Sequence, residues 1–162
     1  MRTIGHYIGG QHTPGTSGRT QDVLKPMTGE VQGTVALASA SDVDAAVQNA
    51  KAAQEAWGAT NPQKRARVMM KFYQLAMEDK QAMAELLALE HGKTVPDAHG
   101  DIQRGLEVVE FAMGIPHLMK GEYTSGAGPQ IDVYSVRQPL GVVAGITPFN
   151  FPAMIPLWKA AP

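Results

Sequence analysis

Cysteine is absent from the 162-residue sequence, and this absence excludes disulfide bonds and metal sites built on thiolates. Long apolar runs are absent too, because no stretch approaches the roughly 20 residues that a membrane-spanning helix needs. The 14 basic and 15 acidic residues nearly balance and are interspersed, so the sequence predicts no basic surface for nucleic acid. Residues Met1–His6 lack the apolar core of a signal peptide. We therefore expect a cytoplasmic protein without nucleic-acid or membrane partners.

Short patterned segments predict hairpins followed by four helices. Residues 3–36 carry β-prone pieces separated by Gly, Pro, Thr and Ser, which is typical of hairpins. Apolar residues then recur at helical spacing in four segments. The predicted helices begin at an N-cap Ser41, at Asn61-Pro62, at Asp79 and near Pro96, and the last two end at Gly92 and Gly114.

The last forty residues predict a glycine-rich loop, two strands and a helix. Residues 121–130 form the loop, and alternation over residues 131–136 predicts a strand. Residues 140–146 are a continuous apolar run, which predicts a strand buried on both faces of a parallel sheet. A helix is expected from Pro152 onward. This order of elements predicts an α/β fold that is incomplete after its first core strand.

The segment around Asn150 resembles the aldehyde dehydrogenase superfamily. It reads Pro-Phe-Asn-Phe-Pro over residues 148–152, with Pro-Leu-Gly-Val at residues 139–142. Similar motifs occur in the same order at Tyr7–Gly10, Pro26–Glu30 and Glu90–Thr94. Phe149 in place of tryptophan, together with Gly100–Glu110, is similar to the methylmalonate-semialdehyde dehydrogenases. The resemblance covers all 162 residues, but only the amino-terminal part of such an enzyme.

This resemblance implies a fold, a reaction and partners. Residues 1–162 would be hairpins and a partial NAD-binding domain that ends with its first parallel strand, and the catalytic domain would be absent. The complete enzyme would be a homo-oligomer that oxidises a semialdehyde with NAD and passes the acyl group to coenzyme A through a cysteine thioester. Because this chain has no cysteine, we expect it to be inactive alone. The alternatives are a water-using aldehyde dehydrogenase, or a non-catalytic short form that binds a ligand or pairs with full-length subunits.

Asn150 is the candidate catalytic residue. In open α/β sheets the ligand crevice lies beyond the carboxyl ends of the strands, and Asn150 follows the predicted strand 140–146. Its amide offers two donors for a developing oxyanion and carries no charge that titration would remove. Such a donor is worth about 2.7–4 kcal/mol of transition-state stabilisation, and the resemblance implies the same role. The alternative is an N-cap for the helix that Pro152 opens.

Thr147 and Phe149 are the candidate cofactor-binding residues. The resemblance implies that this segment lies along the nicotinamide side of NAD. The alternative is that Thr147 only ends the strand and Phe149 fills the core. No Gly-x-Gly-x-x-Gly motif follows a strand, so NAD is inferred from the resemblance alone.

Arg104 is the candidate substrate-binding residue, because a guanidinium can hold a substrate carboxylate with two hydrogen bonds. Ile102, Leu106 and Val109 recur at helical spacing, and Arg104 lies about 160° from Leu106 around the helix, so the apolar stripe does not bury it. The resemblance places a substrate-recognising arginine at this position. The alternative is a surface ion pair with Asp101 or Glu107 on the same helix.

We expect no metal site. His99 and His117 lack histidine or carboxylate partners at the spacing of metal ligands. His91 lies near a helix C-terminus, where the helix dipole favours a basic side chain, so we do not expect it to act as a catalytic base.

Overall fold

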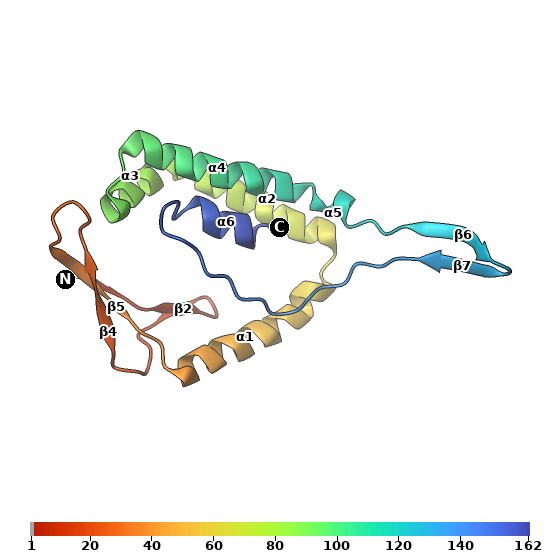
Figure 1. The fold of residues 1–162 in the computed structure, drawn as a ribbon, viewed down its shortest axis with the longest axis horizontal. Coiled ribbons are helices and arrows are strands. Elements are labelled where there is room, and N and C mark those ends of the chain that lie inside the picture. Colours follow the sequence, from red (N-terminus) through yellow and green to blue (C-terminus); the bar gives the residue numbers. More distant parts are fainter. Residues whose placement is uncertain (1) are drawn as a thin grey trace.

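The computed structural model describes residues 2–162, and it places short strands before a layer of helices (Figure 1). The first strands are β1 (Arg2–Ile4), β2 (His6–Ile8), β3 (Gln11–Thr13), β4 (Thr20–Leu24) and β5 (Val31–Ala36). The helices that follow are α1 (Ala40–Ala59), α2 (Pro62–Glu78), α3 (Lys80–His91), α4 (Val95–Met113) and α5 (Ile115–Leu118). The chain continues through β6 (Tyr123–Gly128), β7 (Ile131–Tyr134) and α6 (Met154–Ala160). This mixture confirms the α/β class.

The amino-terminal strands form a three-stranded sheet and a separate hairpin. The sheet has the order β1-β5-β4, in which β1 runs parallel and β4 antiparallel to β5. The hairpin pairs β2 with β3 through Gly9 and Gly10, whose φ angles of 60° and 78° lie in the left-handed region that glycine adopts without a Cβ clash. The predicted hairpins are therefore confirmed, whereas the parallel β1–β5 pairing was not foreseen.

Helix α1 begins two residues earlier than predicted. Its N-cap is Ser39, not Ser41, and the two-way bonding with Asp42 decides between them. Ser39 Oγ accepts from the Asp42 N–H at 3.1 Å, and Asp42 Oδ2 accepts from the Ser39 N–H at 2.8 Å, which satisfies two otherwise unpaired donors. The Thr16 N–H also donates to Asp42 at 3.0 Å. These donors, the Ser39 N–H foremost, hold the pKa of Asp42 well below its usual range.

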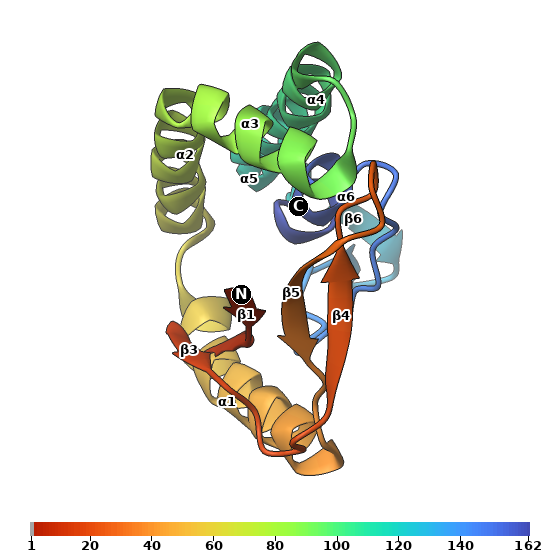
Figure 2. The ribbon, with the colours of Figure 1, turned by 90° about the vertical axis from the view of Figure 1, so that its left-hand side faces the viewer.

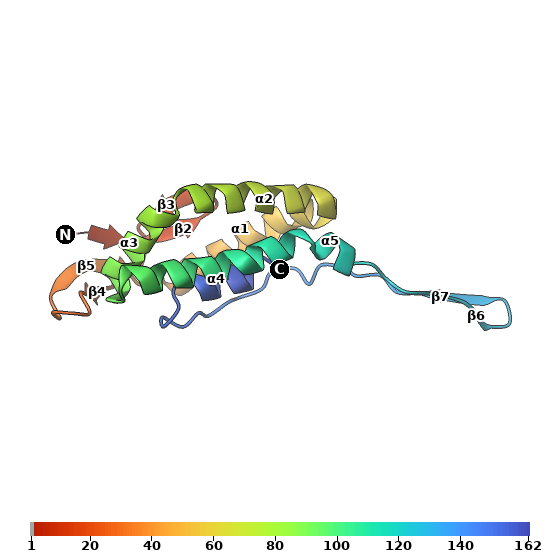
Figure 3. The same cartoon turned by 90° about the horizontal axis from the view of Figure 1, so that it is seen from above.

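Helix α4 contributes the largest fully buried side chains of the core. Ile102, Leu106 and Val109 are completely buried, as their spacing predicted. Helix α4 contacts α2, α3 and α6, and α2 and α4 run side by side in Figure 3. Figure 2 shows α1 and the β4–β5 strands on one side of the molecule and helices α2, α3 and α4 on the other. No residue of α1 is buried.

The starts and ends of α2 and α3 follow the sequence rules. Asn61 caps α2 by accepting from the Gln63 N–H at 2.8 Å, and Pro62 occupies the first turn. Asp79 precedes α3 as predicted, although its side chain makes no capping bond. Gly92 ends α3 with a φ of 83°, in the left-handed conformation expected of a helix-ending glycine.

The predicted glycine-rich loop at 121–130 is wrong, because most of it is strand β6, paired with β7. Asp132 explains the difference. Its two carboxylate oxygens accept from the Gly126 N–H at 2.9 Å and from the Tyr123 hydroxyl at 2.6 Å, across the irregular part of the pairing. This bonding ties the glycine-rich stretch to β7 and holds the pKa of Asp132 below its usual value, with the Tyr123 hydroxyl as the larger cause. The β6–β7 hairpin extends away from the helices (Figure 1).

The predicted buried strand at 140–146 is also wrong. These residues form no strand, and Leu140 and Ile146 are 95% and 90% exposed. A parallel strand needs neighbouring strands to satisfy its backbone groups, and no strand within residues 2–162 pairs with this segment. Across residues 2–162, no helix combines the length and apolar character needed to cross a membrane.

Candidate functional site

A pocket of about 600 Å³ lies between the first half of α4 and the turn that leads into α6. Asn150 and Arg104 both line it, although they are 46 positions apart in the sequence. The remaining lining residues are Lys93, Pro96, Asp97, Gly100, Asp101, Phe151, Met154 and Trp158. The fold thus brings the predicted catalytic residue and the predicted substrate-binding residue to one pocket.

Asn150 lies in the turn before α6 and does not cap that helix. The cap position of α6 is Ala153, without a side-chain hydrogen bond, so the N-cap alternative for Asn150 is wrong. The Asn150 backbone carbonyl accepts from Lys93 Nζ at 3.2 Å. Within residues 2–162 the Asn150 side-chain amide makes no hydrogen bond, so both of its donors remain available to a ligand in the pocket.

Lys93 and Asp101 line this pocket and form an ion pair. Lys93 Nζ lies 3.0 Å from Asp101 Oδ2, and the two side chains are 11% and 0% exposed. Asp101 Oδ1 also accepts from the Met154 N–H at 2.7 Å, and Lys93 Nζ lies 4.9 Å from the centre of the Phe151 ring. The pair therefore connects the turn after α3, helix α4 and the Asn150 turn.

The role of this pair was not predicted from the sequence. Lys93 entered only as part of the Glu90–Thr94 motif, and Asp101 only as a possible partner of Arg104. One signal was present: Asp101 lies three residues after the buried Ala98 and four before the buried Gly105, on a face of α4 that packs against α6. A carboxylate on such a face requires a cation, and Lys93 directly follows the glycine that ends α3.

Arg104 is exposed on α4, as its angular position predicted. Neither ion pair of the surface alternative forms within residues 2–162, because Asp101 pairs with Lys93, and Glu107 instead accepts from Gln103 at 3.3 Å. The backbone carbonyl of Arg104 accepts from the Trp158 indole N–H at 3.2 Å, which ties this part of α4 to α6. The guanidinium is therefore available to an anion in the pocket.

Thr147 and Phe149 do not line the Asn150–Arg104 pocket. Phe149 is 60% exposed, and its ring centre lies 5.3 Å from that of His91. It borders a separate apolar hollow of about 290 Å³ with Leu86, Leu87 and Pro152. Phe149 therefore does not fill the core, and Thr147 lies in the exposed irregular segment before it.

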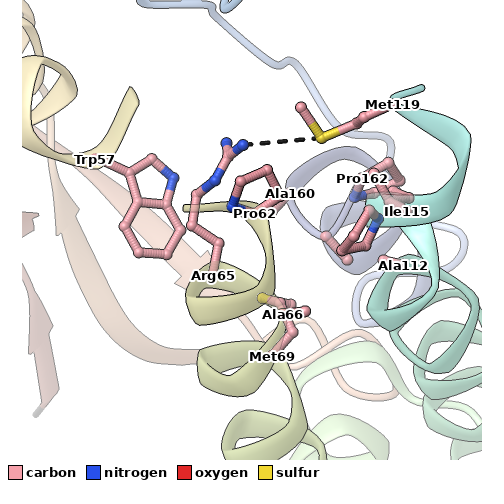
Figure 4. Close-up of a pocket in the computed structure, with 12 residues that line it drawn as sticks. Trp57, Pro62, Arg65, Ala66, Met69, Ala112, Ile115, Met119, Ala160 and Pro162 are labelled. Atoms are coloured by element: carbon pink, nitrogen blue, oxygen red, sulfur yellow. Dashed lines mark hydrogen bonds between the residues drawn. The ribbon is translucent and has the colours of Figure 1, made fainter. Parts of the chain in front are cut away.

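A further cavity of about 310 Å³ lies at the carboxyl end of α6, between α2, α4 and α5 (Figure 4). Its lining is mostly apolar, and Arg65 is its one charged residue. Arg65 donates to Met119 Sδ at 3.8 Å, while its buried Nε has no partner within residues 2–162. None of the four predicted site residues lines this cavity.

No group of three or more His, Asp or Glu side chains lies close enough together within residues 2–162 to hold a metal ion. The pocket offers a neutral amide, a guanidinium and a buried ion pair, and its other carboxylate, that of Asp97, accepts from the Thr94 hydroxyl at 2.8 Å. This combination suits a small ligand that carries both a polar carbonyl and a negative charge.

The chain is similar to known proteins over nearly its whole length. The model of the aldehyde dehydrogenase family matches residues 12–162. A malonate-semialdehyde dehydrogenase of Pseudomonas aeruginosa is 48% identical over 158 residues, which cover 98% of this chain and 32% of that protein. A malonate-semialdehyde dehydrogenase of Geobacillus kaustophilus is 48% identical over 153 residues, or 94% and 31%.

Solved structures agree with these relatives. The crystal structure of a putative methylmalonate-semialdehyde dehydrogenase from Sinorhizobium meliloti 1021, complexed with NAD, matches with a TM-score of 0.95 at 63% identity, over 98% of this chain and 32% of that one. A methylmalonate-semialdehyde dehydrogenase from Oceanimonas doudoroffii matches with a TM-score of 0.93 at 49% identity, over the same shares. The chain spans about a third of the length of these relatives. The matches cover nearly the whole chain, and its α/β fold corresponds to the amino-terminal third of these proteins. The chain therefore belongs to the aldehyde dehydrogenase family.

Proposed function

We propose that this chain is the amino-terminal part of an NAD-dependent dehydrogenase that oxidises methylmalonate semialdehyde or malonate semialdehyde. The observation that carries the proposal is the shared pocket of Asn150 and Arg104. A semialdehyde of this class has a carbonyl at one end and a carboxylate at the other, and these two side chains suit the two groups. The names of the relatives support the same substrate class.

Asn150 would act on the aldehyde end of the substrate. When a thiolate attacks the carbonyl carbon, the carbonyl oxygen gains negative charge, and the Asn150 amide N–H donates to it. The attacking cysteine is not in this chain, so it must come from outside residues 1–162. Arg104 would hold the carboxylate with two parallel N–H bonds and so fix the distance of the carbonyl from Asn150.

NAD would serve as the hydride acceptor of this reaction. The S. meliloti relative was crystallised with NAD, and the residues present here fit a flat ring, because the exposed Phe149 borders an apolar hollow. We propose Thr147 and Phe149 as residues that contact the cofactor. Their place in the sequence, directly before Asn150, would bring the cofactor next to the substrate carbonyl.

Coenzyme A is the proposed acyl acceptor, with water as the alternative. We further propose that the complete enzyme is a cytoplasmic homo-oligomer, as the resemblance to its family implies. The acceptor is tested in a full-length protein that carries this segment, by NADH formation from methylmalonate semialdehyde with and without coenzyme A. Dependence of the rate on coenzyme A, and formation of the acyl-CoA, would support the proposal, whereas equal rates and a free-acid product would establish water as the acceptor.

Substrate recognition is tested with Arg104→Ala in the same full-length protein. Arg104 is exposed in this chain, and in the full-length enzyme we expect the bound substrate to bury its guanidinium. Loss of such a buried charge partner costs about 2–5 kcal/mol, so kcat/KM for methylmalonate semialdehyde should fall by a factor of thirty or more. Propanal, which has no carboxylate, should lose little. Arg137→Ala removes an exposed arginine outside the pocket and is the matched control. Equal losses on both substrates would rule out a role of Arg104 in recognition.

A non-catalytic short form that pairs with full-length subunits is the second candidate function. The exposed apolar residues at 140–146 need neighbouring strands, which a full-length subunit paired with the short form would supply. The rest of a longer chain would supply the same strands, so this exposure favours a fragment of the enzyme over an independent short form. The intact mass of the protein from its native source separates the two candidates. A mass well above 17.3 kDa supports the enzyme, whereas a mass of 17.3 kDa supports the short form, which has no nucleophile.

A further inference from the structure

The Lys93–Asp101 pair is an unusual feature of the pocket, because both side chains are removed from most of the solvent. Desolvation opposes such pairs, and replacing them by uncharged side chains of similar volume is often neutral or stabilising. Stability of the fold therefore gives no sufficient reason for the pair. The other hydrogen bonds of the two side chains show which backbone groups they hold in place.

Both partners hold the turn that carries Asn150. Lys93 Nζ donates to the Asn150 carbonyl at 3.2 Å and lies 4.9 Å from the centre of the Phe151 ring. Asp101 Oδ1 accepts from the Met154 N–H at 2.7 Å. The turn is thus held at its first residue by the cation and at the first residue of α6 by the anion.

Within residues 2–162 the chain just before this turn has one side-chain hydrogen bond to the helices, from Lys159 Nζ of α6 to the Ile146 carbonyl. Residues 140–146 form no strand, and Ile146 and Phe149 are exposed. Most of the support for the Asn150 backbone therefore comes from Lys93, Asp101 and the packing of α6 on α4. This support leaves the Asn150 amide, which faces the same pocket as Arg104, without a competing bond within residues 2–162.

We infer that Lys93 and Asp101 are positioning residues that hold the Asn150 carbonyl and the start of α6, and thereby fix the Asn150 amide opposite Arg104. The catalytic consequence rests on the proposed function. In this role neither side chain touches the reacting atoms. A displacement of the amide by about 1 Å is enough to lower a rate by about 100-fold, so the pair would affect kcat more than cofactor binding.

The test uses a full-length dehydrogenase that carries this segment, with Lys93→Met, Asp101→Asn and the double variant. Lys93→Met keeps the aliphatic stem and removes the donors, and Asp101→Asn keeps an acceptor for the Met154 N–H. The double variant removes both charges, so it should recover the stability that either single change loses. Its kcat should nevertheless remain 10- to 100-fold below that of the unmodified enzyme, with KM for NAD within about twofold.

Lys80→Met is the matched control, because Lys80 is bonded to Gln103 at 2.6 Å and lies outside the pocket. It should leave kcat within about twofold of the unmodified enzyme, in the range of an ordinary surface change. A double variant whose stability and kcat both return to those of the unmodified enzyme would overturn the inference, because the pair would then serve stability alone.

A second readout does not depend on the chemistry. In hydrogen exchange, a peptide covering residues 151–157 should lose protection in the double variant, because a loosened turn weakens the bonds of the Met154, Ile155 and Leu157 N–H groups at the start of α6. Peptides of α2 and of the second half of α4 should keep their protection. Unchanged exchange in that peptide would overturn the inference whatever the activity shows. If the unmodified enzyme failed to oxidise the semialdehyde, the proposed function would fail, and the exchange result alone would still decide the positioning role.

Discussion

Two regions of this chain, helix α4 and residues 140–146, differ in how they are held. Helix α4 is covered by α2, α3 and α6, and its Ile102, Leu106 and Val109 are fully buried. Residues 140–146 are just as apolar, yet they form no strand and leave Leu140 almost wholly exposed. The difference teaches that an apolar pattern alone does not create a core, because a helix satisfies its own backbone, whereas a strand needs neighbours to do so.

Asn150 lies where these two regions meet. It follows the exposed segment, but its turn is attached to the helices by Lys93 and Asp101. The site therefore depends on the helical region for its geometry. Substitutions in the two regions should therefore differ in the size of their effects.

The largest expected contrast is between two leucines. Leu106→Ala should lower the free energy of unfolding by about 2–5 kcal/mol, because it leaves a cavity in the core. Leu140→Ala removes the same atoms from a side chain that is 95% exposed and should change stability by no more than about 0.5 kcal/mol. Denaturant unfolding measures both. A large loss for Leu140→Ala would show that the segment packs in solution.

The next contrast concerns the site itself. Asn150→Ala in a full-length enzyme should lower kcat by about 100- to 1,000-fold, or about 2.7–4 kcal/mol, with little change in stability. Its side chain makes no hydrogen bond within residues 2–162 that folding would lose. Steady-state kinetics measure kcat and thermal unfolding measures stability. Asn49→Ala on α1 is the control. A drop in stability without a drop in kcat would contradict the catalytic role.

The close approach of α6 to α4 is tested at two glycines. A Cβ at Gly105 would lie 2.7 Å from Leu157 Cδ1 and 3.2 Å from Met154 Cα, so Gly105→Ala should destabilise the chain by about 1–3 kcal/mol. A Cβ at Gly100 meets no atom within 4 Å, so Gly100→Ala should stabilise α4 by about 0.5–1 kcal/mol. Thermal unfolding of both variants is the measurement. Equal shifts would show that α6 does not pack as described.

The smallest expected effect is a pH dependence at the start of α1. Hydrogen bonds from the Ser39 and Thr16 N–H groups lower the pKa of Asp42 in the folded chain. Its carboxylate therefore stabilises the fold above the unfolded pKa of about 3.9, and this contribution is lost as pH falls through the lower folded pKa.

The difference in melting temperature between the unmodified chain and Asp42→Asn should accordingly be constant near neutral pH and shrink below about pH 4. Asp44→Asn removes a carboxylate of the same helix that accepts none of these hydrogen bonds, and it is the matched control. A difference in melting temperature that grows as pH falls would contradict this prediction.

The elements that sequence rules predicted well depend on neighbours in the sequence. Asn61 caps α2 through a residue two positions away, Gly92 ends α3 by its own backbone conformation, and the α4 stripe follows helical spacing. Each of these features needs only short-range information. The same holds for Arg104, whose exposure follows from its angle around α4.

The features that were wrong or missed depend on distant partners. Ser39 outcompetes Ser41 as N-cap partly because Thr16, which is remote in sequence, also bonds Asp42. Strand β6 forms because Asp132 bonds two groups of the opposite strand. The Lys93–Asp101 pair, and the pocket that joins Arg104 to Asn150, arise only once α6 returns to α4.

We propose that Asn150 and Arg104 act on opposite ends of one substrate. The most direct test is the ratio of kcat/KM for methylmalonate semialdehyde to that for propanal, measured in a full-length enzyme and in its Asn150→Ala and Arg104→Ala variants. The claim predicts that Asn150→Ala lowers both rates and leaves the ratio unchanged, whereas Arg104→Ala lowers the ratio by at least tenfold. A ratio that Arg104→Ala leaves unchanged, or that falls as far in Asn150→Ala, would contradict it.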